Sequence, residues 1–269
     1  MTKLLVADSA ASLARGWSVQ RRVIGALLMR EVLTRYGRHN IGILWLFVEP
    51  MLYTLGVTAL WNATMSFHGT TLPITAFAVT GYSTVLLWRN MPSRCVQAIE
   101  PNLSLLYHRQ VKVIDIYLAR LILEAAGAGA SFMLLSIVFS FLGMMDLPED
   151  ILLVIGGWLL LAWFGMVLAL FIGALSEQYE IVEKLWHPAA YLSFPLSGAA
   201  FSLHALPERA QHYLSYVPMV NATELLREGY FGSQYIAVYD TKYLILFNLV
   251  LTLFALAEVR KISRIVVPQ

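Results

Sequence analysis

Long apolar stretches alternate with short polar ones along the whole chain. Six stretches have few charges and about 18 residues or more, the length that a helix needs to cross the hydrocarbon core of a bilayer. These stretches lie near 41–64, 72–90, 117–143, 151–175, 185–203 and 241–258. The pattern predicts an all-α membrane protein with six transmembrane helices. It divides the chain into an N-terminal segment 1–40, a transmembrane domain 41–258 and a tail 259–269.

The segment before the first predicted span has an amphipathic pattern. Between residues 13 and 38, apolar residues recur at helical spacing and arginines stand between them, which predicts a helix lying along the membrane surface. Glu31 and Arg35 are four residues apart in the favourable order and can pair. The apolar face consists of Trp17, Ile24, Leu27, Leu28, Val32 and Tyr36. Two roles stay open: a plain anchor, or a helix whose arginines contact a substrate.

The polar loop 91–116 contains a short helical motif. Glu100-Pro101-Asn102 can start a helix, with Asn102 as its cap, and Leu103, Leu106 and Tyr107 then fall on one face. An apolar face at this position either folds back onto the spans or inserts into a groove of a partner. The pattern alone leaves both alternatives open.

The segment 204–240, between the last two predicted spans, is too short for two further spans. Asn221 followed by Glu224 resembles a capping box, and Gly229 suits the end of a short helix. We therefore expect residues 222–228 to form one arm of a re-entrant hairpin and residues 213–217 to form the other. The alternative is a small cap that rests on the lipid headgroups.

Composition and charge support a membrane protein and give its orientation. The chain is 58% hydrophobic and only 13% charged, whereas soluble domains have about 25% charged residues. The net charge is only +2, but all except three of the 19 Lys and Arg residues flank one side of the predicted spans. The three exceptions are Arg209, Arg227 and Lys242. By the positive-inside rule, both termini are expected in the cytoplasm.

Several kinds of chemistry have little support. The chain has no Gly-x-x-x-x-Gly-Lys motif, so any ATP must be bound by another subunit. The single cysteine argues against a disulfide or a Cys-based metal site, and the six histidines have no i, i+4 pair. Pairing Ser83 with His187 would suggest an intramembrane enzyme, but the motif around Ser83 is incomplete. An ion-coupled transporter should have more intramembrane carboxylates than Glu49 and Glu124.

Glu49 and Pro50 lie inside the first predicted span. An ionised carboxylate at this depth costs a few kcal/mol unless protein or water surrounds it, and proline removes one backbone donor. One interpretation is a proline kink in which the glutamate only shapes the helix. The other is that Glu49 lies beside a polar pathway.

Three segments carry a resemblance to a known family. Residues 35–50 run from Arg-Tyr-Gly-Arg through Ile-Gly-Ile-Leu-Trp to Glu-Pro. This resembles the start of the first span in permeases of the ABC-2 type, with Ile41 in place of the usual leucine. Residues 102–112 and 216–224 are similar to segments of the capsule-polysaccharide branch, the KpsM-type inner-membrane subunits.

The resemblance implies a homodimer of six-span subunits bound to two copies of a separate ABC ATPase subunit. ATP and Mg would be bound by that partner, and this chain would carry no cofactor. The implied function is export of a lipid-linked acidic capsular polysaccharide across the inner membrane of a Gram-negative bacterium, together with periplasmic capsule-export components and without nucleic acid. Alternatives within the family are another glycolipid polymer, such as O-antigen or teichoic acid, and a small hydrophobic molecule.

The resemblance also assigns roles to the segments described above. Residues 17–38 would be an interfacial gate helix, residues 102–107 a coupling helix, and residues 212–231 periplasmic gate helices. Arginines bind phosphate bidentately and sugars stack on aromatic rings. The expected substrate-binding residues are Arg30, Arg35, Arg38, Arg89, Arg94, Trp45, Glu49, Tyr53, Trp61, Tyr82 and Trp88. The expected ATPase-coupling residues are Asn102, Leu103, Leu105, Leu106, Tyr107, His108 and Arg109. The expected gate residues are Tyr213, Tyr216, Pro218, Asn221 and Glu224.

Overall fold

The computed structural model describes residues 2–37, 44–64, 72–107 and 110–266, and every regular element in these ranges is a helix. The all-α prediction is therefore confirmed. The longer helices are α1 (Thr2–Tyr36), α2 (Trp45–Thr64), α3 (Ile74–Cys95), α5 (Val113–Phe141), α6 (Ile151–Ser176) and α10 (Thr241–Val266). The shorter ones are α4 (Leu103–Leu106), α7 (Glu180–Leu192), α8 (Glu208–Leu214) and α9 (Pro218–Phe231), with a few 3-10 turns between them.

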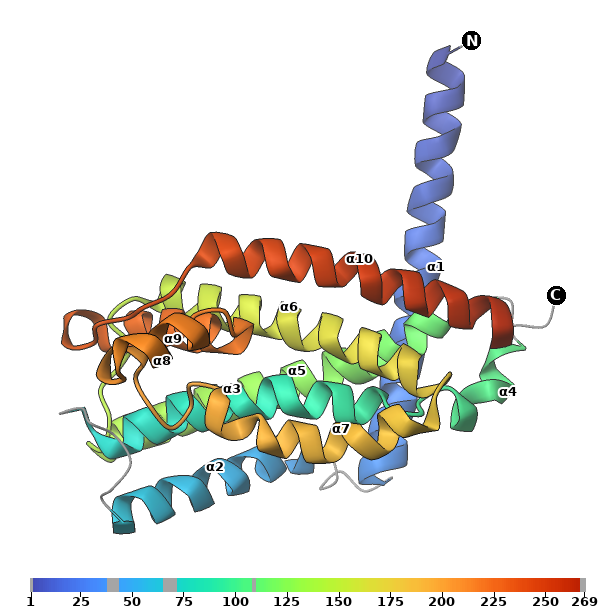
Figure 1. The fold of residues 1–269 in the computed structure, drawn as a ribbon. Coiled ribbons are helices and arrows are strands. Elements are labelled where there is room, and N and C mark those ends of the chain that lie inside the picture. Colours follow the sequence, from blue (N-terminus) through green and yellow to red (C-terminus); the bar gives the residue numbers. More distant parts are fainter. Residues whose placement is uncertain (1, 38–43, 65–71, 108–109, 267–269) are drawn as a thin grey trace.

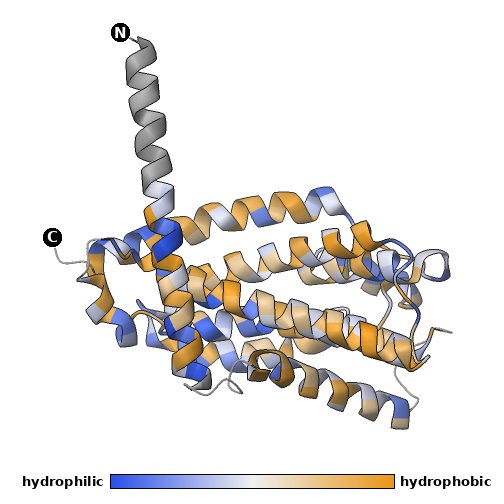
Figure 2. Ribbon diagram, turned by 180° about the vertical axis from the view of Figure 1, so that it is seen from behind, coloured by the Kyte–Doolittle hydropathy of each residue, from blue (hydrophilic) through white to orange (hydrophobic). Residues whose placement is uncertain are grey.

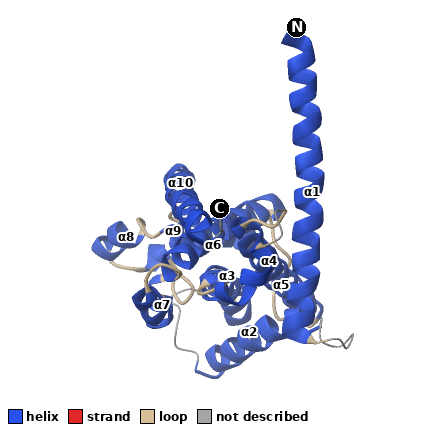
Figure 3. Cartoon of the chain, turned by 90° about the vertical axis from the view of Figure 1, so that its right-hand side faces the viewer, coloured by secondary structure: helices blue, strands red, loops and turns tan. Residues whose placement is uncertain are grey.

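Helices α2, α3, α5, α6, α7 and α10 run alongside one another as a bundle (Figure 1). Helix α6 packs against α3, α9 and α10, and α3 packs against α2 and α5. One end of the bundle carries α4, the start of α5 and the end of α10, and we call it the α4 end. The opposite end carries α8 and α9, and we call it the α9 end. Helix α1 runs crosswise to the bundle beside the α4 end (Figures 1 and 3).

Three of the described helices are long and apolar enough to cross a membrane: α5, α6 and α10. Hydrophobic residues dominate the long helices of the bundle (Figure 2). Large apolar side chains on α5, α6 and α10 are exposed, among them Ile137, Leu159 and Leu253, as contact with lipid requires. Helices α2 and α3 coincide with the first two predicted spans but are not among these three. The six-span count therefore stays a prediction.

The predicted fifth span, 185–203, is not one continuous helix. Helix α7 begins earlier, at Glu180, and ends at Leu192 after 13 residues, which is too short to cross a bilayer alone. A 3-10 turn with Pro195 at its start follows, and Gly198 adopts a left-handed conformation at φ +78°. Proline offers no backbone donor and a left-handed residue cannot continue a helix, so the chain leaves the helical path here.

Helix α1 is longer than the predicted 13–38 segment, since it begins at Thr2. It ends at Tyr36, where Gly37 takes a left-handed conformation at φ +78°. Leu27 is buried in the core against the bundle, whereas Trp17 is exposed. The amphipathic face therefore packs against protein, mainly α5, over part of its length. The side chain of Tyr36 lies outside the described residues.

The expected capping box at the α9 end is wrong. Helix α9 begins four residues before the expected start at residue 222, because Pro218 takes the first helical position, where a missing N–H costs nothing. The side chain of Asn221 donates to the carbonyl oxygens of Ser215 and Val217 at 2.6 and 3.2 Å. The helix also continues past Gly229 to Phe231. Gly229 is needed for close packing instead, since a Cβ there would lie 2.7 Å from the backbone nitrogen of Val154 in α6.

A buried carboxylate fastens the loops at the α9 end. Glu224 is fully buried and accepts hydrogen bonds from the backbone N–H of Leu203 at 3.0 Å, from the hydroxyl of Tyr235 at 2.6 Å and from the backbone N–H of Val238 at 3.1 Å. A buried carboxylate is tolerated only when donors surround it in this way. Glu224 therefore joins α9 to the segments before and after it.

A buried cation fastens the irregular segment that follows α7. Arg227 is fully buried and donates to the carbonyl oxygens of Gly198, Ala199 and Phe201 at 2.7, 2.5 and 2.8 Å. It also donates to the carbonyl oxygen of Phe77 in α3 at 3.4 Å. These carbonyls have left the helical pattern, and the guanidinium supplies the donors that they lack. The sequence analysis used Arg227 only as a charge for orientation.

Candidate functional site

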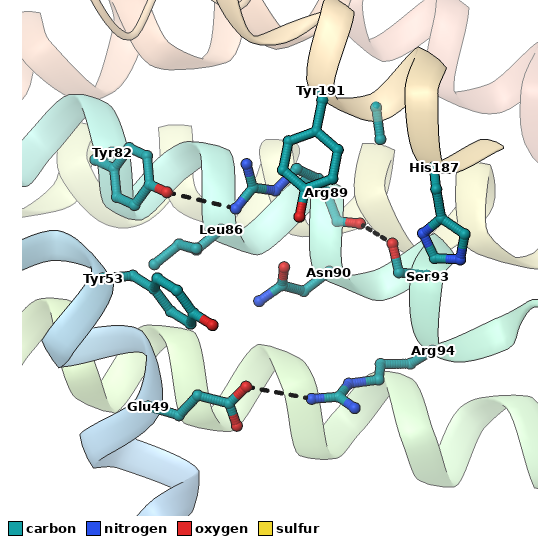
Figure 4. Close-up of a pocket in the computed structure, with 11 residues that line it drawn as sticks. Glu49, Tyr53, Tyr82, Leu86, Arg89, Asn90, Ser93, Arg94, His187 and Tyr191 are labelled. Carbon is teal, nitrogen blue, oxygen red and sulfur yellow. Dashed lines mark hydrogen bonds and ion pairs between the residues drawn. The ribbon is translucent and has the colours of Figure 1, made fainter. Parts of the chain in front are cut away.

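A cavity of about 340 Å³ opens between α2, α3 and α7 (Figure 4). Most of its lining comes from one face of α3, where residues three or four apart point the same way. The opposite face of that helix, including Leu87 and Met91, is buried in the core. The lining residues are Glu49, Tyr53, Tyr82, Leu86, Arg89, Asn90, Ser93, Arg94, His187, Ala190 and Tyr191.

Arg89 is held between two aromatic rings. Its guanidinium carbon lies 5.9 Å from the centroid of the Tyr82 ring and 5.1 Å from that of the Tyr191 ring. The Nη2 group also donates to the Tyr82 hydroxyl at 3.5 Å. Among the described residues, no carboxylate pairs with Arg89. A cation that rests on π faces keeps its charge available for an anionic ligand.

Arg94 is paired on two sides, and the two pairs differ. Its Nε lies 3.1 Å from Oε1 of Glu124, whose side chain is only 12% exposed. Its Nη2 lies 3.7 Å from Oε1 of Glu49, whose side chain is 44% exposed and lines the cavity. The first pair is mostly buried in protein. The second faces the cavity, and Figure 4 marks it with a dashed line. Of the two interpretations of Glu49, a residue that only shapes the helix or one beside a polar pathway, the structure favours the second, because Glu49 lines the cavity.

A network of ion pairs continues from Arg94 towards α1. Arg35 bonds to Glu124 and also to Glu31 at 3.1 Å, which confirms the predicted Glu31–Arg35 pair. The Nε of Arg120 lies 3.3 Å from Oε1 of Glu31, and its Nη1 donates to the carbonyl oxygen of Arg94 at 2.8 Å. The network joins α1, α2, α3 and α5. Arg35 is committed to it, so the expectation that Arg35 binds substrate is not supported.

Arg30 is not in the cavity lining either. Arg30 donates to the side chain of Asn102, in the 3-10 turn Glu100–Asn102 that precedes α4. Arg38 lies outside the described residues. Of the four expected substrate-binding arginines that the structure describes, Arg89 and Arg94 line the cavity. The sequence gives the positions of the arginines along the chain, but not the side chains distant in sequence that pair with them, such as Glu124 and Asn102.

The predicted aromatic residues also divide into two groups. Tyr53 and Tyr82 line the cavity. Trp61 and Trp88 are buried in the core and do not line the cavity, so their contact with substrate stays a prediction. Trp45 is exposed but does not line the cavity. Aromatic residues occur on more than one face of α2 and α3. The sequence could not tell which face of each helix would line the cavity.

Sequence analysis missed part of the lining. It did not single out Tyr191, Asn90 or Ser93, and it considered His187 only as a partner of Ser83. Helical spacing from Tyr82 and Arg89 would have indicated the α3 residues. Ser83 is buried and does not line the cavity, so the structure gives no support to the enzyme alternative. In the part of the chain that the structure describes, no group of three or more metal-ligating side chains could hold a metal ion.

The α4 end presents two of the expected ATPase-coupling residues to solvent. Asn102 does not cap α4, because its amide donates to the carbonyl oxygen of Ala98 at 2.7 Å. Leu106 is 5% exposed and belongs to the core, and Leu105 packs against that core. Leu103 and Tyr107 are 42% and 76% exposed. The predicted apolar face is therefore split, with its inner part folded back and its outer part open.

A groove of about 410 Å³ adjoins α4 and is lined by Glu100, Leu103, Glu177 and Glu180, among others. Glu177 accepts a hydrogen bond from the backbone N–H of Ile99 at 2.8 Å. Burial raises the pKa of Glu177 and outweighs this hydrogen bond, which lowers it. The other two expected coupling residues, His108 and Arg109, lie outside the described residues.

The five expected gate residues lie together at the α9 end but differ in exposure. Tyr213 and Tyr216 are exposed. Pro218 starts α9, and Asn221 and Glu224 are buried and bonded to backbone groups. The buried pair therefore supports the loops, and only the two tyrosines are open to a passing ligand.

Comparisons with known proteins agree along almost the whole chain. Residues 22–231 match the family model described as ABC-2 type transporter. The chain is 47% identical over 252 residues to the capsule polysaccharide export inner-membrane protein CtrC of Neisseria meningitidis serogroup B, covering 94% of this chain and 95% of that protein. It is 40% identical to the corresponding protein BexB of Haemophilus influenzae, with the same coverage. The polysialic acid transport protein KpsM of Escherichia coli is 27% identical over 245 residues, covering 91% of this chain and 95% of that protein.

Proposed function

The chain belongs to the ABC-2 type transporter family, and from this premise we propose that it is the transmembrane subunit of an ATP-driven exporter of lipid-linked capsular polysaccharide in the bacterial inner membrane. One observation carries the proposal: 47% identity to a capsule polysaccharide export inner-membrane protein over 94% of this chain. The same architecture would serve export of another glycolipid polymer, and the experiment below separates the two.

We propose six membrane crossings with the α4 end in the cytoplasm. The basic residues support this orientation, since nearly all of them belong to segments at the α4 end. The fifth crossing would be a broken helix formed by α7 and residues 193–203. Irregular backbone at membrane depth is tolerated where protein satisfies it, and Arg227 donates to three carbonyls in that segment. Helices α8 and α9 would be the two arms of the re-entrant hairpin on the periplasmic side.

The proposed engine is a separate ABC ATPase that binds ATP and Mg. Two copies would dock on a homodimer of this chain, each contacting the exposed Leu103 and Tyr107 of one α4 end. The contact between Arg30 and Asn102 connects that end to α1, and the ion pairs of Arg35 continue to the cavity wall. Packed interfaces have discrete arrangements, so a movement of α4 can shift these helices as bodies. Periplasmic capsule-export components would receive the polymer.

The cavity is the proposed contact for the anionic end of the cargo. Arg89 would attract a carboxylate or a phosphate, while Tyr53, Tyr82 and Tyr191 offer ring surfaces to sugars. No single tight site is needed, because a moving polymer requires weak and repeated contacts.

The test is complementation of a capsule-deficient strain that lacks its own permease. The wild-type chain, expressed with the ATPase of its relatives, should restore capsule at the cell surface. Arg89→Gln should lower export about 10-fold, since one charge-assisted contact is lost, while the amount of assembled complex stays unchanged. Arg264→Gln is the matched control, an exposed arginine that does not line the cavity. Restoration of a different surface polymer, without capsule, would favour another glycolipid as cargo.

A further inference from the structure

The cavity contains an anion of its own. Among the described residues that line it, Glu49 is the single acidic side chain. Its Oε1 lies 3.7 Å from Nη2 of Arg94, which is beyond hydrogen-bond distance. Arg94 and Glu49 are 37% and 44% exposed, so solvent reaches both partners. Ion pairs of this kind contribute little stability, and this pair can open at small cost.

The other side of Arg94 is fixed. Its Nε lies 3.1 Å from Glu124, which also receives a hydrogen bond from Arg35 in α1. Glu124 is only 12% exposed, so salt and solvent screen this pair less than the one with Glu49. The guanidinium of Arg94 therefore stays in place when Glu49 leaves it. The Nε of Arg94 is held by Glu124, and its Nη2 faces the cavity with N–H donors.

We propose that Glu49 is an internal counter-ion that an anionic group of the cargo displaces from Arg94. The proposal rests on the function proposed above, because it requires an anionic cargo in this cavity. In the empty cavity Glu49 is the carboxylate that faces the free donors of Arg94 from the cavity side. When a cargo carboxylate or phosphate first binds near Arg89, it exchanges with Glu49 on Arg94, and one ion pair replaces another.

This exchange makes Glu49 a specificity-determining residue. A neutral sugar chain cannot replace the carboxylate of Glu49 on Arg94, so the Arg94–Glu49 pair stays formed. An acidic chain gains an ion pair but loses the one it breaks, and its net affinity stays low enough for the polymer to move on. The opening of the pair also removes a contact between α2 and α3. Glu49 is therefore a positioning and selecting group, and the primary attraction comes from Arg89.

If the exchange occurs, removing the negative charge of Glu49 should strengthen the binding of an acidic ligand. We would reconstitute the chain with its ATPase partner in lipid nanodiscs and titrate two probes of equal length, a sialic acid oligomer with one carboxylate per sugar and a neutral dextran oligomer. Tryptophan fluorescence and ATPase activity report binding. Glu49→Gln should lower the half-saturating concentration of the acidic probe by about 3- to 10-fold, the effect of one solvent-accessible charge pair. Binding should also become more sensitive to salt, because an ion pair now forms without another being broken.

Two further variants make the result specific. In Glu49→Gln combined with Arg94→Gln, the gain in affinity should disappear, since the exchanged cation is gone. Glu31→Gln is the matched control: it removes a carboxylate from the same network, outside the cavity lining, and should change probe affinity by less than about two-fold. Dextran binding should be the same in all variants.

The proposal is overturned if Glu49→Gln binds the acidic probe no better than the wild type while Arg94→Gln weakens binding, because Arg94 would then hold cargo without competition from Glu49. Failure of the proposed cargo site has a different signature. In that case the wild-type complex would not prefer the acidic probe to dextran, and Arg89→Gln would change nothing; the counter-ion proposal would then fall with the site.

Discussion

The guanidinium carbon of Arg227 lies 3.7 Å from the centroid of the Phe77 ring. This contact joins α9 to α3 in the interior of the protein, and the same guanidinium donates to carbonyl oxygens of the segment after α7. No carboxylate of the described residues forms an ion pair with it. Arg227 is thus held by backbone oxygens and an aromatic face, and one side chain fixes three parts of the chain.

Replacing Arg227 should destabilise the protein even when its charge is kept. Lysine carries one compact ammonium group and cannot reproduce the fork that reaches several carbonyls. Arg227→Lys should lose about 2–4 kcal/mol of unfolding free energy, because buried carbonyls lose their donors. Thermal unfolding in detergent measures this loss. Arg209→Lys, at an exposed position in α8, is the control and should change stability by less than about 0.5 kcal/mol. Equal stability of the two variants would show that the carbonyl cradle contributes nothing.

A glycine in α3 leaves room for this cradle. A Cβ at Gly81 would meet the carbonyl oxygen of Ala199 and lie 2.5 Å from Nη2 of Arg227. Gly81→Ala should therefore cost about 1–3 kcal/mol, despite the better helix propensity of alanine. At Gly56 in α2, an added Cβ would have no atom within 4 Å, so Gly56→Ala should be neutral or slightly stabilising. A thermal shift assay on both variants checks the prediction, which is wrong if they unfold alike.

Exposed and buried side chains at α4 should respond differently to substitution, the exposed ones through docking of the ATPase and the buried one through folding. Leu103→Asp with Tyr107→Asp should abolish association with the ATPase while the subunit still inserts, because both side chains are open to solvent. Leu106→Asp should instead destabilise the subunit by several kcal/mol, since it places a charge in the core. Affinity purification of the complex and the yield of folded subunit distinguish the outcomes. Normal association of the double variant would exclude the exposed face of α4 as the docking site.

The local stability around Glu177 should depend on pH. Because its pKa is raised on folding, the ionised form is disfavoured in the folded state. The buried state of Glu177 should therefore be most stable below the ordinary value of 4.5 and weaken as the pH rises through the raised pKa, because the hydrogen bond from Ile99, which favours the ionised form, offsets only part of the burial cost. Hydrogen exchange of the Ile99 amide, corrected for the intrinsic rate, measures this. Glu177→Gln still offers an oxygen to that amide and should show no such dependence; the same slope in both proteins would contradict the assignment.

The sequence predicted features that depend on local patterns. The uninterrupted apolar runs of α5, α6 and α10 lie where they were expected, and the Glu31–Arg35 pair forms because both residues belong to one helix. The fifth predicted span is not one continuous helix, because Pro195 and Gly198 take the chain off the helical path although the composition stays apolar. Helix α9 begins at Pro218, because proline is favoured at the first helical position, so Asn221 lies inside the helix and does not cap it.

The candidate site was harder to predict, because tertiary contacts define it. The sequence suggested Arg35 and Arg94 as substrate-binding residues but could not show that Glu124, distant in sequence from both, pairs with each of them. Nor could it show which aromatic rings enter the core: Tyr82 and Trp88 are on the same helix, yet only Tyr82 lines the cavity. Such assignments require the rotation of each helix against its neighbours.

We propose that this chain forms the passage while a partner hydrolyses the ATP. The most direct measurement is transport of a fluorescently labelled, lipid-linked acidic polysaccharide into inside-out vesicles that contain the purified chain, with and without the ATPase of its relatives. The account predicts uptake only when both proteins and ATP are present, and no ATP hydrolysis by the chain alone. Uptake or ATP hydrolysis by the chain without its partner would contradict it.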